Sequence, residues 1–338
     1  MSCHAARRTT RPLAAGAGLS LRSGLRRRAL AGLLGGIALP RPGFATTREP
    51  AELLVPSPTG SQTDRWARGV APFLERAWPR QALSVRNHPG QGGLQAVEEL
   101  ATSDRRIIGV LTTPLLLSRA VETAAPSPFA RIAALAALVE EPVVLVGAPG
   151  GGTELDSLRT TASGAPPGAP IGTPPPGTGA HVTALRIAAR LGRPVLAFPS
   201  AAAARQAAAA GHVAAAALTV PDAIDHLREN RLVAFGIAAR DRSALLPDLP
   251  TLREAGLELL GATRRGFALA PDAPAAWRGW LLAGLETLAT DPDFAAHCAE
   301  YGRVPRFLGP DAWGTLLARQ EEELRRHWRA EPWLLQRT

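Results

Sequence analysis

Short apolar runs alternate with segments of helical character along most of this chain, and that alternation limits the possible folds more than any other feature. Runs of strand length include Ile107 to Leu111, Val195 to Phe198 and Val213 to Leu218. Helix-forming segments such as Leu94 to Ala101 and Ala201 to Ala210 separate runs of this kind. Strands that alternate with helices form a parallel or mixed sheet with helices on both faces. The sequence therefore predicts an α/β fold.

One assignment in the first half of the chain stays open. Pro142 to Val146 has strand composition, whereas Ala133 to Val139 is rich in alanine and fits either a strand or a helix. Gly147 to Gly152 follows as a turn-rich joint at which the chain can leave one domain for another. A chain of 338 residues is long enough to form two domains, each with its own core.

A glycine- and proline-rich loop leads into a helix near the centre of the chain. Ile171 to Thr178 reads Ile-Gly-Thr-Pro-Pro-Pro-Gly-Thr, and apolar residues then follow at helical spacing up to Leu191. Thr178 or Gly179 is the expected N-cap. The first turn of a helix has N–H groups without intrahelical acceptors and the positive end of the helix dipole, which together favour a bound carboxylate or phosphate. A loop that only connects two elements is the alternative.

A similar loop occurs early in the chain. Glu52 to Val55 is a strand candidate, and the small residues from Pro56 to Asp64 lead into a helical pattern. Thr63 or Asp64 is expected to cap this helix, and a plain helix residue that binds nothing is the alternative for Asp64. Pro72 is expected to kink or interrupt the helix. Ligands of α/β sheets bind beyond the carboxyl ends of the strands, so the two loops together favour an anion site.

The net charge of +9 comes almost entirely from the first 45 residues. That segment holds eight arginines and no acidic residue, and without it 30 basic residues face 29 acidic ones. The remainder has no overall positive field that would attract a polyanion. This distribution argues against nucleic acid as a partner.

Residues 1–45 have the pattern of an export signal peptide. Arg26, Arg27 and Arg28 precede an apolar run from Ala29 to Leu39, and the segment ends with the small residue Ala45. The apolar run is too short to span a bilayer. The arginines are compatible with Sec or twin-arginine export, and a basic tail is the alternative. We expect a periplasmic protein.

The sequence lacks the usual signatures of a catalytic or metal centre. Cys298 is the only cysteine after residue 45, so neither a disulfide nor a cysteine-based metal motif is expected. The histidines lie in no HExxH context, and neither GxSxG nor CxxC occurs. We therefore predict that the chain is not an enzyme and uses no cofactor or metal. His181, at a helix start, is the candidate base if that prediction is wrong.

Four motifs carry a family resemblance. Pro58 to Asp64 reads Pro-Thr-Gly-Ser-Gln-Thr-Asp, and Asn87 to Gly93 reads Asn-His-Pro-Gly-Gln-Gly-Gly. Gly172 to His181 has glycine, threonine and histidine at a fixed spacing. The most specific motif, Arg242 to Gly256, reads Arg-Ser-Ala-Leu-Leu-Pro-Asp-Leu-Pro-Thr-Leu-Arg-Glu-Ala-Gly. In these motifs the chain resembles the Bug-type (TctC-like) substrate-binding proteins of tripartite tricarboxylate transporters, over nearly everything after residue 45.

The resemblance implies a two-lobed periplasmic binding protein type II fold, in which each lobe is a mixed, mostly parallel sheet flanked by helices. After the export signal it implies residues 46–148 as the first part of lobe 1 and residues 149–263 as lobe 2. Residues 264–338 would return to lobe 1 and form the C-terminal helices. Two chain crossings, near Gly147 to Gly152 and near Gly261 to Gly266, would serve as hinges.

In the family, amides and hydroxyls of two loops hold a carboxylate, partly through water. The resemblance assigns this role to Thr59, Gly60 and Ser61 on one lobe and to Thr173, Gly177 and Thr178 on the other. On the other lobe the prolines between Thr173 and Gly177 remove three N–H donors from the loop. With flanking residues and two pocket positions that the motifs do not fix, the predicted ligand contacts are Ser57, Thr59, Gly60, Ser61, Thr63, Asp64, Thr173, Gly177, Thr178, His181, Ser200 and Thr219.

The function that this implies is capture of a small di- or tricarboxylate in the periplasm. The protein would act as a monomer and deliver its ligand to the membrane permease subunits of a tripartite tricarboxylate transporter. An exported ligand-sensing protein of the same fold that acts on a membrane sensor is one alternative. A diverged member that no longer binds a carboxylate is another. The sequence identifies neither the ligand nor the export route.

Overall fold

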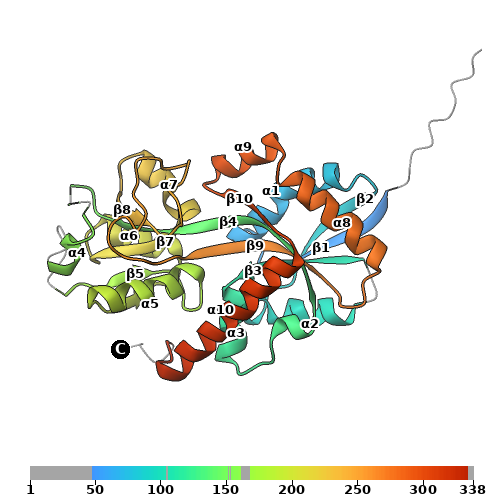
Figure 1. The fold of residues 1–338 in the computed structure, drawn as a ribbon, viewed down its shortest axis with the longest axis horizontal. Helices are drawn as coiled ribbons and strands as arrows, with labels where there is room; N and C mark the ends of the chain where they lie inside the picture. The colour runs from blue at the N-terminus through green and yellow to red at the C-terminus, as the bar shows by residue number, and fades with distance from the viewer. Residues whose placement is uncertain (1–47, 104–105, 151, 153, 161–167, 334–338) are drawn as a thin grey trace, which may run out of the picture. The chain divides into compact units, whose positions relative to one another are not determined.

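The predicted alternation of strands and helices is present in a computed structural model, which describes residues 48–103, 106–150, 152, 154–160 and 168–333 (Figure 1). The predicted export signal lies outside the described residues. The described strands are β1 (Glu49–Val55), β2 (Gln81–Asn87), β3 (Ile107–Thr113), β4 (Ala133–Gly147), β5 (Ile171–Thr173), β6 (Val195–Ala197), β7 (Ala215–Thr219), β8 (Val233–Ile237), β9 (Ala262–Leu269) and β10 (Val304–Leu308).

Helices connect most of these strands and cover the sheet on both faces (Figure 1). The described α-helices are α1 (Gln62–Ala77), α2 (Leu94–Thr102), α3 (Leu115–Glu122), α4 (Ser157–Thr160), α5 (Gly179–Leu191), α6 (Ala201–Ala209), α7 (Val220–Arg228), α8 (Ala275–Leu288), α9 (Pro292–Glu300) and α10 (Pro310–Ala330).

The described strands form a mixed sheet in the order β2-β1-β3-β9-β4-β7-β5-β6, with β8 and β10 also paired to β4. β1 is parallel to β2 and β3, and β5 is parallel to β6 and β7. β9 runs antiparallel to both β3 and β4. The α/β class predicted from the sequence is confirmed.

One long strand, β4, joins the two halves of this sheet. Its first part pairs with β9 and β10, and its last part, from Val143 to Gly147, pairs with β7 and β8. We refer to β1, β2, β3, β9 and β10 as the first half and to β5, β6, β7 and β8 as the second half. The alanine-rich segment from Ala133 to Val139 is therefore strand, because pairing on both sides outweighs the helix propensity of alanine. The predicted lobe limits at residues 148 and 263 stay predictions.

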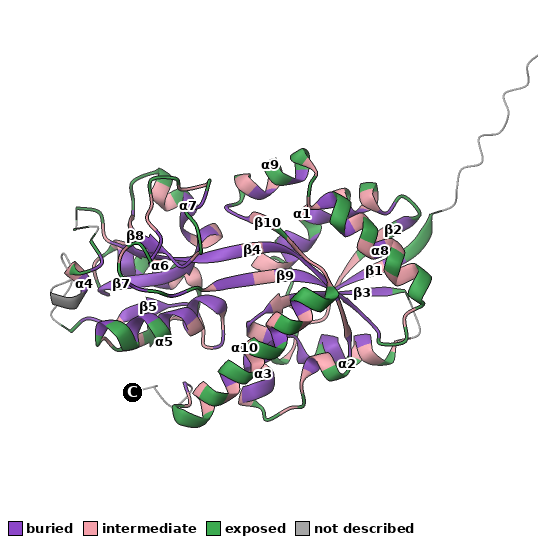
Figure 2. Ribbon diagram, viewed as in Figure 1, coloured by how far each residue is buried: buried purple, intermediate pink, exposed green. Residues whose placement is uncertain are grey.

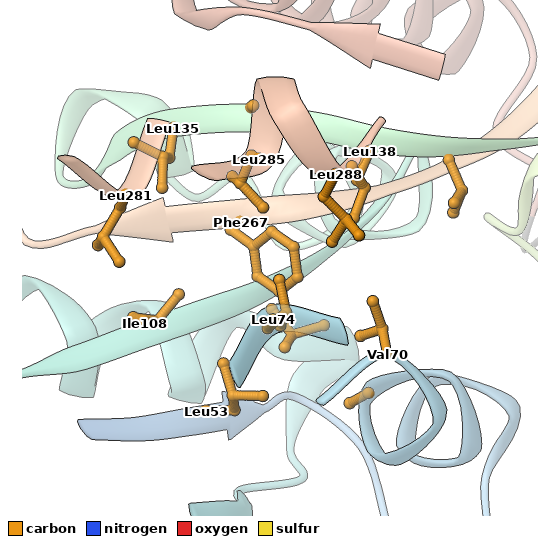
Figure 3. Packing of buried hydrophobic residues seen from close by; sticks show 14 of the residues in the cluster. Leu53, Val70, Leu74, Ile108, Leu135, Leu138, Phe267, Leu281, Leu285 and Leu288 are labelled. Carbon is orange, nitrogen blue, oxygen red and sulfur yellow. The ribbon is translucent and has the colours of Figure 1, made fainter. Parts of the chain in front are cut away.

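The core of the first half surrounds the ring of Phe267 in β9, which is fully buried (Figure 3). Side chains from α1, α8 and the neighbouring strands pack around this ring. Figure 2 shows the same distribution along the elements, with buried residues on the strands and exposed residues on the outer faces of the helices. The labelled members of this cluster are Leu53, Val70, Leu74, Ile108, Leu135, Leu138, Phe267, Leu281, Leu285 and Leu288.

The N-caps of α1 and α5 were both predicted from the sequence, and the structure agrees with one of the two predictions. Thr178 caps α5 as predicted, because its side chain accepts a hydrogen bond from the amide of His181. The predicted capping of α1 by Thr63 or Asp64 is wrong, since Ser61 accepts from the Asp64 amide instead (3.2 Å). The predicted interruption at Pro72 is also wrong, because α1 continues through this residue to Ala77.

Candidate functional site

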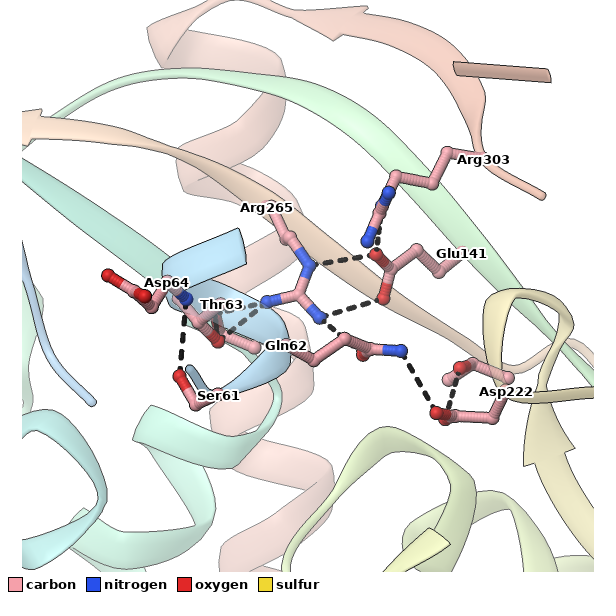
Figure 4. Close-up of polar contacts among 10 residues, drawn as sticks. Ser61, Gln62, Thr63, Asp64, Glu141, Asp222, Arg265 and Arg303 are labelled. Atoms are coloured by element: carbon pink, nitrogen blue, oxygen red, sulfur yellow. Dashed lines mark hydrogen bonds and ion pairs between the residues drawn. The ribbon is translucent and has the colours of Figure 1, made fainter. Parts of the chain in front are cut away.

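Helices from both halves of the sheet begin close together at the carboxyl ends of strands. β1 leads to α1 in the first half, while β5 leads to α5 and β7 to α7 in the second. At the start of α1, Gln62 donates a hydrogen bond from Nε2 to Oδ1 of Asp222, in the first turn of α7 (2.9 Å; Figure 4). Because α/β sheets bind ligands at such strand ends, we take the region around this bond as the candidate site.

Arg265 of β9 is the most connected side chain in this region, and only 3% of it is exposed. Its Nε and Nη2 donate to the two carboxylate oxygens of Glu141, at 2.8 and 3.0 Å. Nη2 also donates to Oε1 of Gln62 (2.9 Å), and Nη1 donates to the hydroxyls of Thr63 (2.7 Å) and Thr112 (3.2 Å). The guanidinium thus fixes two side chains in the first turn of α1 (Figure 4).

Glu141 of β4 is fully buried and faces a second arginine. Nε of Arg303, which precedes β10, donates to its Oε1 at 2.8 Å. Burial favours the neutral carboxyl, but attraction to Arg265 and Arg303 outweighs it and lowers the pKa of Glu141 below its ordinary value. Glu141 is therefore ionised, and its single negative charge is shared by two guanidinium groups.

Asp222 of α7, which accepts from Gln62, is the member of this hydrogen-bonded series that lies in the second half. Its Oδ2 accepts from the hydroxyl of Thr219 at 2.6 Å, and its main-chain oxygen accepts from Nη1 of Arg205 at 2.6 Å. Burial raises the pKa of Asp222 above its ordinary value. We call Gln62, Glu141, Asp222, Arg265 and Arg303 the bridging network. With Arg205 beside it, three guanidinium groups face two carboxyl groups, which leaves an excess of positive charge.

The first predicted loop is held by its own aspartate. The Asp64 carboxylate accepts from the amide of Gly60 (2.8 Å), from Nδ2 of Asn87 (2.9 Å) and from Nε of Arg68 (2.9 Å). Burial opposes ionisation, but these hydrogen bonds outweigh it and lower the pKa of Asp64. Oδ2 binds the loop amide while Oδ1 binds Asn87 of β2 and Arg68 of α1, so this side chain holds the loop against its neighbours.

The hydroxyls of the first loop also have partners. Ser57 and Ser61 share a hydrogen bond between their Oγ atoms (2.7 Å), and Thr59 donates to Oδ1 of Asn87 (3.1 Å). The amide of Ser61 donates to the carbonyl of Pro58 at 3.2 Å. In this arrangement the predicted amide donors Gly60 and Ser61 are therefore both engaged inside the loop.

The second predicted loop folds back on itself in the same way. The Gly177 amide donates to Nδ1 of His181 (3.3 Å), and the Thr178 amide donates to the carbonyl of Pro175 (3.3 Å). Burial, with nearby His327 and Arg119, lowers the pKa of His181 to about 4, so its ring is neutral at pH 7. A neutral ring that accepts from a loop amide positions the loop and leaves no free base at this nitrogen.

The hydroxyl of Thr173 differs from the other predicted contacts. Thr173 is the last residue of β5 and is fully buried, and its Oγ1 has no hydrogen-bond partner among the described residues. The same holds for Ser118 of α3, which packs close to the loop: a Cβ added at Gly177 would lie 2.9 Å from the Ser118 Cβ. These two hydroxyls are therefore available as donors near the second loop.

The structure brings some of the predicted contacts together and separates others. Ser57, Thr59, Gly60, Ser61 and Asp64 form one group of hydrogen-bonded residues around α1. Thr63 and Thr219 join the bridging network, whereas Ser200 is exposed and caps α6 by accepting from the Ala203 amide. A second group surrounds the start of α5 and contains Thr173, Gly177, Thr178 and His181.

Sequence reasoning did not select the members of the bridging network. A usable signal was present, because Glu140-Glu141 and Arg264-Arg265 place paired charges of opposite sign inside otherwise apolar strands. A buried charge requires a partner, so two such pairs indicate strands that are neighbours. Within the described residues, side chains of His, Cys, Asp and Glu form no group of three or more that could hold a metal ion. None of the helices in the described ranges is both long and apolar enough to cross a bilayer.

Comparison with known proteins gives a family. The model of the tripartite tricarboxylate transporter family receptor, TctC, matches residues 68–303 of this chain. Protein BugT of Bordetella pertussis is 27% identical over 229 residues, which span 65% of this chain and 70% of BugT.

Solved structures give the fold. A TctC solute-binding protein from Polaromonas has a TM-score of 0.70 at 20% identity, over 83% of this chain and 98% of its own. An R. palustris protein solved with adipate has a TM-score of 0.69 at 18% identity, over 85% of this chain and 97% of its own. The fold is that of a periplasmic binding protein, as the resemblance implied.

We predict that replacing Arg265 by methionine lowers the free energy of unfolding by about 3 kcal/mol, because Glu141 keeps only one of its two partners in a buried site. The neighbouring substitution Arg264→Met is the control. Arg264 pairs with Glu140 at 2.6 Å, but both side chains are partly exposed, at 17% and 22%. We expect this control to cost less than about 1 kcal/mol. Urea denaturation measures both, and equal losses would contradict the special role of Arg265.

We predict that Asp222→Asn becomes more stable relative to the wild type as the pH rises above the ordinary aspartate pKa of 3.8. Above that pH the unfolded wild type loses the Asp222 proton while the folded protein still holds it, so stability falls until the pH passes the raised folded pKa. Below pH 3.8 the two proteins should be alike. Denaturation from pH 3 to 8 measures the difference.

The matched variant Asp64→Asn should show the opposite sign. The pKa of Asp64 is lowered by folding, so the wild type gains stability from this carboxylate above pH 3.8 and loses that gain as the pH falls. A pH profile of Asp222→Asn parallel to that of the wild type, or equal to that of Asp64→Asn, would contradict the burial of Asp222.

Proposed function

This chain belongs to the tripartite tricarboxylate transporter receptor family, and we propose that it is a periplasmic solute-binding protein that captures a small carboxylate. The ligand would bind between the two halves of the sheet, near the starts of α1, α5 and α7. The protein would present it to the permease subunits of a tripartite tricarboxylate transporter. The family model, which covers residues 68–303, supports this assignment of class.

The observation that carries this proposal is the hydrogen bond between Gln62 and Asp222. It links the start of a helix in the first half with the start of a helix in the second (2.9 Å). A ligand at this place would touch both halves at once, which is the arrangement that a binding protein needs in order to close on its ligand. The first turns of α1 and α7 also contribute main-chain N–H groups and positive dipole ends.

The charges around the site favour an anion. Arg265 and Arg303 bind the carboxylate of Glu141, and Arg205 donates to the main-chain oxygen of Asp222, so three guanidinium groups lie near two carboxyl groups. Arg265 already binds both oxygens of Glu141, so it would act on a ligand through its charge and through the positions of Gln62 and Thr63. Adipate, with which a structural relative was solved, supports a dicarboxylate as the first class to examine.

The donors for this ligand would be hydroxyls more than loop amides. The amides of Gly60, Ser61, Gly177 and Thr178 all have intramolecular acceptors, and the prolines after Thr173 have no N–H. The Thr173 hydroxyl is buried and unpaired among the described residues. An unpaired buried hydroxyl costs about 1 to 3 kcal/mol, and a carboxylate oxygen that accepts from it would remove that cost.

We expect the purified protein to bind at least one member of a panel of malate, succinate, adipate and citrate. Isothermal titration calorimetry measures binding, and thermal unfolding measures the stabilisation that follows from it. Matched monoamides of the same acids are the control, because they keep the shape and remove one charge. If a folded preparation binds none of the acids, or binds the monoamides equally well, the carboxylate proposal fails.

We predict that Thr173→Val weakens binding of the panel ligand by about tenfold or more without loss of stability. Valine has a similar shape and removes a hydroxyl that has no partner among the described residues, while a hydrogen bond to a charged ligand is worth about 1.5 to 3 kcal/mol. Thr251→Val is the control, since its buried hydroxyl bonds to Glu254 (3.1 Å) outside the predicted contacts. Thr251→Val should lower the free energy of unfolding and leave the affinity unchanged. If Thr173→Val leaves the affinity unchanged, Thr173 is not part of the site.

We further propose that residues 1–45 direct export to the periplasm. When the whole chain is expressed in a bacterium with two membranes, osmotic shock should release a shortened protein that begins near Thr46. Replacing Arg27 and Arg28 by lysine should block export only if the twin-arginine route is used, and a Sec substrate should tolerate it. Recovery of the uncleaved chain from the cytoplasm alone would contradict export.

A further inference from the structure

A groove of about 440 Å³ lies between α5 and α10, and it shares no residue with the bridging network. It is also lined by the segment that crosses from β8 in the second half to β9 in the first half. In this segment Leu260 is 50% exposed, and Gly261 and Ala262 follow it. Pro114, at the start of α3, closes one side. A cavity of this size falls within the range of sites for small organic molecules, about 300 to 1,000 Å³.

Two helices line the groove with matching stripes. α5 contributes Gly179, Val182, Thr183 and Arg186, which occupy positions i, i+3, i+4 and i+7 of one helix face. α10 contributes six residues: Gln320, Glu323, Leu324 and His327 repeat this spacing, and Arg326 and Ala330 also line the groove. The helix rises by roughly 15 Å between Gln320 and Ala330, which suits a short molecule and is too short for a long protein segment.

The groove combines an apolar interior with a basic rim. Val182, Leu260 and Leu324 line it with aliphatic surface, and Arg186 and Arg326 contribute guanidinium groups. Among the described residues that line it, Glu323 is the one carboxylate, and it pairs with Arg319 at 3.0 Å. An occupant with an aliphatic body and a single negative charge would match both features.

We propose that this groove binds a small amphiphilic monocarboxylate, with its chain along the aliphatic residues and its carboxylate at Arg186 and Arg326. This site is separate from the one proposed for the di- or tricarboxylate, and it does not depend on that function. Its two walls pack mainly on different halves of the sheet: α5 lies chiefly on β5 and β7 and also reaches β9, while α10 packs on α3, β4 and β10. A bound molecule would therefore contact both halves.

Octanoate is the probe, and isothermal titration calorimetry of the purified protein measures its binding. Octanoate would bury two more methylene groups in the groove than hexanoate, so it should bind roughly tenfold more tightly. Octylammonium keeps the chain and reverses the charge, and it should bind at least tenfold more weakly than octanoate. Equal affinities for hexanoate and octanoate, or for the two charges, would overturn the proposal.

Two pairs of substitutions on α10 locate the binding. Ala330→Trp fills the groove, and Ala318→Trp adds the same side chain at an exposed position of α10 that does not line it. Arg326→Gln removes a rim charge, and Arg329→Gln removes an exposed charge that does not line the groove. We expect about a tenfold or greater loss of octanoate affinity for the first variant of each pair and less than a twofold change for the second.

The variant Thr173→Val separates this site from the proposed carboxylate site. Octanoate affinity should be unchanged in Thr173→Val, and binding of the panel dicarboxylate should be unchanged in Ala330→Trp. Octanoate binding that survives both groove substitutions but is lost in Thr173→Val would show that octanoate enters the carboxylate site, and the groove proposal would then be wrong.

Discussion

Glu141 is a fully buried carboxylate in β4, the strand that both halves of the sheet share. A charge in such a place is stable only when it is paired and hydrogen-bonded. The pairing comes from Arg265 of β9 and from Arg303, so three separate parts of the chain must meet at this point. Arg265 then reaches Gln62 and Thr63, and through Gln62 the start of α1 is joined to Asp222 of α7. The position of the candidate site follows from the need to pair one buried charge.

The need of buried polar groups for hydrogen-bond partners also explains why the loops hold fewer free amides than their sequences indicate. Asp64 draws the Gly60 amide to its own carboxylate, and the neutral ring of His181 accepts from the Gly177 amide. These bonds fix the loop shapes before any ligand arrives, which lowers the entropy lost on binding. Recognition would then depend on a few hydroxyls, such as that of Thr173, and on the excess of positive charge around the bridging network.

Features that depend on local sequence patterns, such as strands and helices, were predicted from the sequence. Contacts between residues that lie far apart in the sequence were not. Alternating strands and helices and the cap of α5 at Thr178 follow from periodicity and capping chemistry, and they are confirmed. The cap of α1 was assigned wrongly because Ser61, Thr63 and Asp64 are all good caps, and only the fold decides which one reaches the helix amides. Arg265 and Asp222 lie far apart in sequence from Gln62. Their meeting with it required the full sheet order, whereas the charge pairs in β4 and β9 indicate only that these two strands are neighbours.

The groove and the bridging network are connected through one strand. Ala262, at the start of β9, lines the groove, and Arg265, three residues later, is the centre of the network. Gly261 just before it binds β4, since its carbonyl accepts from the amide of Val143 at 2.9 Å. A molecule in the groove and a carboxylate near Gln62 would both contact the two halves on either side of this crossing. A ligand shifts the arrangement of the two halves only if it binds one arrangement more tightly than another, and any coupling between the two sites would then be reciprocal.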